Sequence, residues 1–108
     1  MGVQDEGTIT FWLRHQHADW ATNGHRYDLG RTYRSGVFVE AVKQPDRTIE
    51  LSVSGPLGET FDMRSPIPPC DARGLFVAIT WQGTKADLYL NGEHAQTVTW
   101  PPHDTLRA

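Results

Sequence analysis

Residues 74–100, GLFVAITWQGTKADLYLNGEHAQTVTW, decide the fold of this chain. Apolar side chains recur at every second position from Leu75 to Trp81, which is the period at which side chains share one face of a β-strand. The polar segment 82–85 predicts a turn. Asn91-Gly92 is the strongest short signal for a two-residue hairpin, because both residues tolerate positive φ. We therefore expect three successive antiparallel strands here.

Shorter runs of the same kind precede this stretch. They predict strands at residues 7–13, 25–31, 37–42, 48–54 and 59–63. The segment 65–71, SPIPPCD, is too rich in proline for a central strand and predicts a connection or an edge. The best helical candidate, residues 16–21, ends at Asn23-Gly24 within about two turns. The pattern predicts an all-β fold, an antiparallel two-sheet β-sandwich of about eight short strands.

Length and composition predict one small domain. The chain has 108 residues, and we expect a core region at 7–100 with loose ends at 1–6 and 101–108. Only 38% of the residues are hydrophobic, but four Trp, four Phe and three Tyr offset this share because each buries a large area. Of the tryptophans, Trp12, Trp81 and Trp100 are expected in the core or at an interface. The single cysteine, Cys70, excludes an internal disulfide, so stability must come from packing.

The charge and the first residues limit the partners and the compartment. The net charge is -3, so we expect no nucleic-acid ligand. There is no run of 18 apolar residues, so no membrane span is expected, and the start MGVQDEGTITF lacks the basic and apolar regions of a secretory signal. The cytoplasm is the expected compartment if the chain is complete, and the compartment is open if it is a piece of a longer protein.

Two segments resemble a known superfamily. Residues 7–13, GTITFWL, are similar to the first strand of concanavalin A-like lectins and glucanases, in particular of laminin G-like domains. Residues 77–81, VAITW, followed by residues 88–92, LYLNG, resemble the paired-strand signature of the same superfamily. The resemblance spans residues 7 to 99, and it implies a two-sheet jelly roll that binds carbohydrate or another protein.

The chain departs from that superfamily in two respects. It is short, so strands at one or both ends are expected to be missing, and the exposed sheet edges favour pairing with a second copy. We therefore hypothesise a homodimer that completes a sheet or covers one face. Relatives with a calcium site use loop clusters of Asp, Asn and carbonyl oxygens, and we match no such cluster here. No resident cofactor is expected, with calcium or zinc as the alternative.

The region 14–36 is unusually rich in histidine, arginine and aromatic residues, which is typical of a ligand surface. Aromatic rings stack on sugars, and arginines suit anionic glycans or acidic peptides. The predicted ligand-binding residues are Arg14, Trp20, Arg31, Tyr33 and Arg34. The alternative is that Trp20 and Tyr27 are core residues and that the arginines only solvate the rim. We favour the core for Tyr27 and ligand contact for Arg31, Tyr33 and Arg34.

The same region offers candidate metal ligands. His15 and His17 are two residues apart and would point the same way on an extended chain, while His25 and Asp28 lie across the Asn23-Gly24 turn. Two imidazoles and a carboxylate would suit zinc with an open position. The alternative is that these histidines are ordinary surface residues.

Catalysis is the third hypothesis. Glycoside hydrolysis needs two opposed carboxyl groups, and the Glu-x-Asp-x-Glu run of the glucanases is absent from this sequence. Glu40 and Glu50 fall on neighbouring predicted strands, and their alternative role is a solvated face. There is no GxxxxGK phosphate loop and no GxSxG elbow. We therefore do not expect an enzyme.

Two classes of function remain from these observations. The leading hypothesis is a non-catalytic recognition module that binds a glycan or a protein. The competing hypothesis is a small structural or oligomerisation protein, in which an exposed sheet face with Thr10, Trp12 and Thr80 meets a second copy. A concave site with aromatic and arginine side chains would favour the first, and a flat self-matched apolar face the second.

Overall fold

The fold is that of a computed structural model, which describes residues 6–34, 36–55, 60–71, 73–83 and 85–99. These residues contain eight β-strands. The strands are β1 (Glu6–Leu13), β2 (Tyr27–Arg34), β3 (Val37–Lys43), β4 (Thr48–Ser54), β5 (Thr60–Pro66), β6 (Leu75–Gln82), β7 (Lys85–Leu90) and β8 (Glu93–Thr99). The predictions for Trp100 and for the two ends of the chain fall largely outside the described residues.

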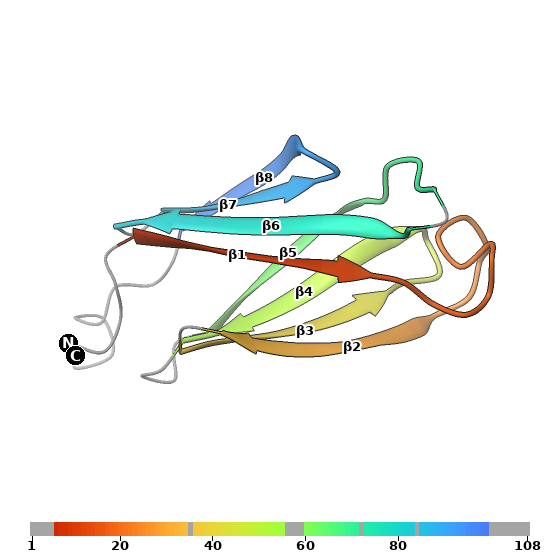
Figure 1. Cartoon of the computed structure of the whole chain (residues 1–108), viewed down its shortest axis with the longest axis horizontal. Helices are drawn as coiled ribbons and strands as arrows, with labels where there is room; N and C mark the ends of the chain where they lie inside the picture. The colour runs from red at the N-terminus through yellow and green to blue at the C-terminus, as the bar shows by residue number, and fades with distance from the viewer. Residues whose placement is uncertain (1–5, 35, 56–59, 72, 84, 100–108) are drawn as a thin grey trace.

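The strands form two antiparallel layers (Figure 1). Sheet A has the order β1-β6-β7-β8, and sheet B is the meander β2-β3-β4-β5. The expectation of an all-β fold with two antiparallel sheets is confirmed. The described residues hold no helix long and apolar enough to cross a membrane.

The strand limits differ most from the predicted ones in β2 and β5. β2 begins at Tyr27 and runs to Arg34, whereas the sequence predicted residues 25–31. β2 also contains a bulge between Asp28 and Gly30, at which Gly30 takes a φ of 101° and the register against β3 shifts. β5 extends to Pro66, at the outer edge of sheet B among the described strands. Proline is tolerated there because an edge strand leaves its outer N–H groups unpaired.

The core lies between the sheets and is built by the alternation read from the sequence. Ile49 and Leu51 of β4 meet Leu88 and Leu90 of β7 in one buried cluster. The described buried hydrophobic residues are Ile9, Leu13, Trp20, Val37, Val39, Ala41, Ile49, Leu51, Val53, Met63, Leu75, Val77, Ile79, Trp81, Ala86, Leu88 and Leu90. The opposite side chains of sheet A form its outer face, which is turned away from this core and carries the candidate site.

The two open sides of the sandwich are closed differently. On one side, the Gln96 side chain of β8 accepts a hydrogen bond of 2.8 Å from the backbone N–H of Arg64 in β5. On the other side, between β1 and β2, a cavity of about 190 Å³ remains, lined by residues that include Phe11, Leu29 and Ala41. The sheets are thus tied along β5 and β8 and less tightly packed along β1 and β2.

Candidate functional site

The structure does not bring the predicted ligand-binding residues together. Arg14 is exposed in the loop that follows β1, at the end of the sandwich where β2 begins. Trp20 is only 4% exposed and belongs to the core, so the prediction that it offers a stacking face is corrected. Tyr27 packs against the same core, as the alternative reading proposed. The loop uses its aromatic residues to anchor itself to the sandwich.

The remaining three predicted residues lie along β2. Arg31 and Tyr33 pair with Glu40 and Phe38 and share the outer face of sheet B, where the Tyr33 ring is 67% exposed. Arg34 is the last residue of β2, about 23 Å along the strand from Tyr27. Since Arg14 lies near the start of β2, Arg14 and Arg34 lie at opposite ends of the sandwich and cannot contact one small ligand.

The candidate metal ligands surround an aromatic ring instead of a common point. The His15 and His17 rings stack with centroids 5.0 Å apart, and the Tyr27 ring lies 4.3 Å from that of His15. His25 approaches the same tyrosine edge-on, and Asp28 accepts a hydrogen bond from the Gly30 N–H. No group of three or more His, Cys, Asp or Glu in the described residues is placed to hold a metal ion. In this structure the four candidate ligands therefore do not converge on one point.

A buried lysine holds this loop in place. The Lys43 side chain is fully buried, and its ammonium donates to the Asn23 and His25 carbonyl oxygens and to the Asn23 amide oxygen. The ammonium also lies 5.5 Å from the centre of the Tyr27 ring. Loss of hydration, followed by the nearby Arg47 charge, lowers the pKa of Lys43. The buried Lys43 ammonium thus holds the loop between β1 and β2 against the core.

The two carboxylates considered for hydrolysis are engaged with neighbours. Glu40 opposes Ser52 and Glu50 opposes Val42, so the two acids lie diagonally on the outer face of sheet B. Glu40 lies 3.6 Å from the Arg31 guanidinium, and Glu50 accepts a hydrogen bond of 2.6 Å from Gln44. This arrangement corresponds to the solvated face that was the alternative role of both residues.

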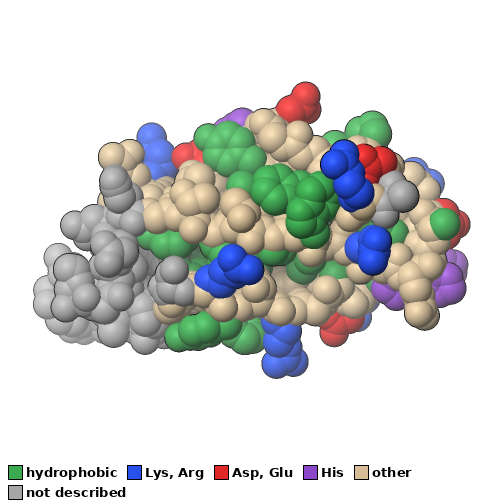
Figure 2. All heavy atoms as spheres, in the orientation of Figure 1, with side chains coloured by type: hydrophobic (Ala, Val, Ile, Leu, Met, Phe, Trp, Pro, Cys, Tyr) green, Lys and Arg blue, Asp and Glu red, His purple; other side chains and the backbone are tan. Residues whose placement is uncertain are grey.

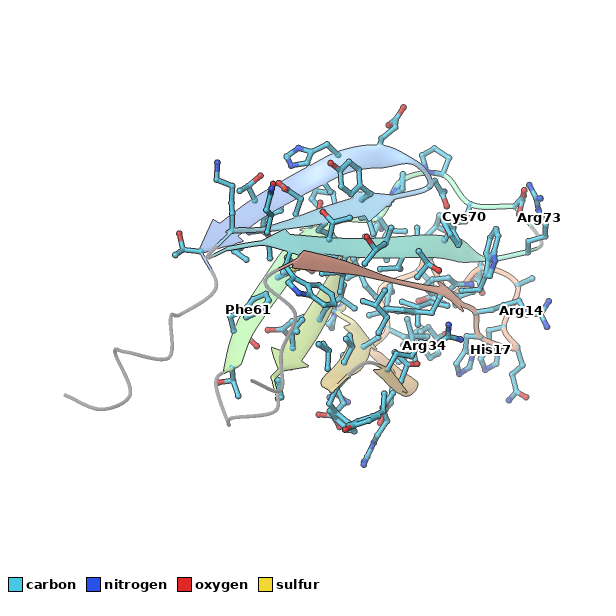
Figure 3. The ribbon with its side chains drawn as sticks, turned by 60° about the vertical axis from the view of Figure 1, so that its left-hand side comes forward. Arg14, His17, Arg34, Phe61, Cys70 and Arg73 are labelled. Atoms are coloured by element: carbon cyan, nitrogen blue, oxygen red, sulfur yellow. The ribbon has the colours of Figure 1, made fainter. Side chains whose placement is uncertain are left out.

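A cleft of about 670 Å³ opens instead on the outer face of sheet A, and we call it the Trp12 cleft. Its lining residues are Trp12, Pro69, Cys70, Asp71, Arg73, Gly74, Phe76, Asn91 and Gly92. They come from the end of β1, the start of β6, the β7–β8 turn and the loop between β5 and β6. Figure 2 shows hydrophobic side chains gathered on this face with charged side chains beside them. Figure 3 shows Cys70 and Arg73 at the same end of the sandwich as Arg14 and His17, far from Phe61.

Strand alternation explains why an aromatic pair faces solvent here. Leu13 points into the core, so its neighbour Trp12 points outward and is 50% exposed. Trp12 pairs with Phe76 across β1 and β6, and their ring centroids are 5.0 Å apart. The Arg73 guanidinium lies 5.6 Å from the centre of the Trp12 ring. The cleft therefore has an aromatic wall with a cation at its rim.

The polar wall of the cleft is fixed by short-range hydrogen bonds. Asp71 accepts from the backbone N–H of Arg73 at 2.8 Å and from its guanidinium at 2.9 Å. The hydrogen bond from the Arg73 side chain is the main reason that the pKa of Asp71 is lowered, so this carboxylate stays ionised at neutral pH. Asn91 donates to the Pro69 carbonyl and accepts from the Phe76 N–H. The polar groups are therefore held in fixed positions before any ligand arrives.

Cys70 lies in the wall of the cleft. Its thiol donates to the Pro68 carbonyl oxygen at 3.2 Å, and burial raises the pKa of the thiol. A raised pKa keeps the thiol protonated near neutral pH, when it is a poor nucleophile. We therefore assign Cys70 a structural place in the wall.

Part of this site was visible in the sequence, and part was not. The alternation of residues 7–13 already placed Trp12 and Thr10 on one face. The segment 65–71 was interpreted only as a connection or an edge, although its end supplies Asp71 and the turn to Arg73. Its signal was an Asp followed by Arg73-Gly74 directly before a strand, which is typical of a turn whose side chain bonds its own backbone.

Comparison with known proteins gives no relative for this chain. No protein-family profile, no curated protein and no solved structure matches it. A function must therefore be argued from the geometry of the site.

Proposed function

We propose that this protein is a non-catalytic recognition module that binds carbohydrate in the Trp12 cleft. The observation that carries the proposal is the half-exposed Trp12 ring in a concave site beside fixed polar groups. The C–H face of a sugar ring stacks on an aromatic ring, while the hydroxyls at its rim require donors and acceptors in set positions. Asp71 supplies acceptors and Arg73 supplies donors.

The charge balance of the cleft favours a neutral glycan. Asp71 and Arg73 are the two charged residues among the described residues that line it, and they are paired with each other. An anionic sugar would have to compete with the Asp71 carboxylate for the Arg73 guanidinium. A neutral sugar hydroxyl can donate to the carboxylate and accept from the guanidinium at once.

The proposed function goes together with a jelly-roll topology of the two sheets. The likeness of residues 7–13, 77–81 and 88–92 to concanavalin A-like and laminin G-like domains supports a jelly-roll topology for this chain. The two antiparallel sheets are compatible with that architecture. The superfamily contains carbohydrate-binding proteins, which agrees with the proposed ligand class.

A glycan array followed by titration calorimetry on the bound glycans tests this function. We expect array signals from neutral glycans, and Trp12→Ala should weaken binding about tenfold, since stacking of a flat ligand on one aromatic ring contributes on the order of 1–3 kcal/mol. Tyr33→Ala is the matched control, because Tyr33 is an exposed aromatic residue on the outer face of the other sheet. Asp71→Asn provides a second variant that leaves the aromatic wall intact.

The outcomes separate the two surfaces. Loss of binding in Trp12→Ala and Asp71→Asn with normal binding in Tyr33→Ala supports the Trp12 cleft. The reverse pattern would assign recognition to the predicted region 14–36. Because the pKa of Asp71 is lowered, affinity should be level above pH 5 and fall only as the pH drops below about 4. No array signal from any glycan would reject carbohydrate binding.

Self-association is the second candidate function, and one observation favours it. The half-exposed Trp12 shares the outer face of sheet A with Thr10 and Thr80, which are the residues that the self-association hypothesis names. Analytical ultracentrifugation of the wild-type protein and of Trp12→Ala separates the candidates. A stable wild-type dimer that Trp12→Ala dissociates, together with a silent array, would assign this face to assembly.

A further inference from the structure

A second cleft of about 610 Å³ lies at the other end of the same sheet face. Its described lining residues are Gly7, Thr8, Thr80, Trp81, Gln82, Gly83, Lys85 and Asp87. Thr8 opposes Thr80 across β1 and β6, and Trp12 opposes Phe76 on the same two strands. The two clefts therefore lie four residues apart along β1, which is about 13 Å.

Small side chains form the strip of surface between the two clefts. Its central pair is Thr10 opposite Ala78, and both side chains are small. Tyr89 lies beside Ala78 across β6 and β7, and its ring contacts the His94 ring edge-on at 5.4 Å. Large aromatic rings thus lie at the Trp12 end and along the β7 border of this strip, while its floor and its Thr8–Thr80 end carry only small side chains.

The second cleft repeats the polar character of the first. Asp87 is bonded to the Thr97 hydroxyl and lies 3.0 Å from His94, which fixes its carboxylate. The Thr97 hydroxyl is the main cause of the lowered pKa of Asp87, so this acid is also ionised at neutral pH. Lys85 on the same strand supplies a balancing charge at the rim.

We propose that the outer face of sheet A is one extended groove that takes a linear neutral oligosaccharide, with the Trp12 cleft and the Thr8–Thr80 cleft as its two ends. This inference rests on the proposed function. A single sugar ring would occupy one cleft, whereas a chain laid over Thr10 and Ala78 reaches both. The paired threonines and the fixed Asp87 carboxylate then bond hydroxyls that the Trp12 cleft cannot reach.

Chain-length dependence of binding tests the groove. The probes are cello-, manno- and chito-oligosaccharides of one to six units, measured by titration calorimetry. We expect affinity to rise by about tenfold or more between the disaccharide and the longest chains, as contacts at the second cleft are added. Thr10→Tyr raises the floor between the clefts and should remove this gain while the disaccharide affinity stays unchanged. Ser52→Tyr, an exposed position on sheet B, is the matched control.

Failure of the groove and failure of the proposed function give different results. Equal affinity for short and long chains, with binding lost in Trp12→Ala, overturns the groove and keeps the Trp12 cleft. A gain with chain length that survives in Thr10→Tyr also overturns it. Absence of binding by every probe and every array glycan overturns both. A gain with length that only Thr10→Tyr removes supports the groove.

Discussion

Lys43 shows how one residue fixes a long loop. The loop between β1 and β2 contains no strand or α-helix, yet its Trp20 ring is buried and the backbone at Asn23 and His25 is bonded from below by the Lys43 ammonium. Charged groups are rarely fully buried unless their hydrogen bonds are satisfied. Here three acceptors surround one ammonium, so the cost of removing it from water is offset.

Replacing Lys43 by methionine should therefore destabilise the protein. The change removes the charge that is costly to bury, but it leaves the Asn23 and His25 carbonyl oxygens without their donor. We expect a loss of about 2 kcal/mol in the free energy of unfolding, measured by urea denaturation, with faster proteolysis in residues 14–26. Lys85→Met, on an exposed residue, should change stability by less than about 0.5 kcal/mol. Unchanged stability in Lys43→Met would contradict the tether.

At the scale of elements, two glycines with nearly the same φ angle have different structural roles. Gly30 has a φ of 101° in the β2 bulge, and Gly74 has a φ of 99° directly before β6. A Cβ atom on Gly30 would meet nothing within 4 Å. A Cβ atom on Gly74 would lie 2.3 Å from the Leu13 carbonyl oxygen, which belongs to the backbone of β1. Gly74 thus permits the close approach of the turn to β1 that shapes the Trp12 cleft.

The pair Gly74→Ala and Gly30→Ala separates backbone strain from collision. Both variants impose a left-handed backbone on alanine, which costs about 1–3 kcal/mol. Only Gly74→Ala adds the collision with β1, so its loss should exceed that of Gly30→Ala by about 1–3 kcal/mol. Thermal and urea unfolding of both variants provides the comparison, and equal losses would show that the approach to β1 does not matter.

The elements also show what the sequence could and could not predict. The alternation in residues 37–54 and 75–90 predicts strands and core faces directly, because burial of one face requires a period of two. The end of β2 and the position of Trp20 were missed, since a bulge and a loop anchor depend on contacts between distant residues. The site was missed for the same reason: Trp12 and Asp71 are 59 positions apart, and only the β1–β6 pairing brings them together.

At the scale of the molecule, a space remains between the two sheets along β1 and β2. Gly30 pairs with Ala41 at an inward position of sheet B. Neither residue carries a large side chain, and the cavity of about 190 Å³ lies beside them. On the opposite side, Gln96 links β8 to β5 by a direct hydrogen bond. We therefore attribute the cavity to the bulge, because it places Gly30, which has no side chain, at a position that faces the core.

Filling this cavity should stabilise the whole sandwich. Ala41→Val adds two methyl groups beside the cavity, and burying them should raise the free energy of unfolding by about 1 kcal/mol. Ala86→Val is the matched control, because Ala86 is equally buried but lies opposite Trp81, away from the described lining of this cavity. Overpacking should cost that variant about 1–3 kcal/mol. Urea unfolding measures both changes. If Ala41→Val were as destabilising as Ala86→Val, the space between β1 and β2 would have to be closed in solution.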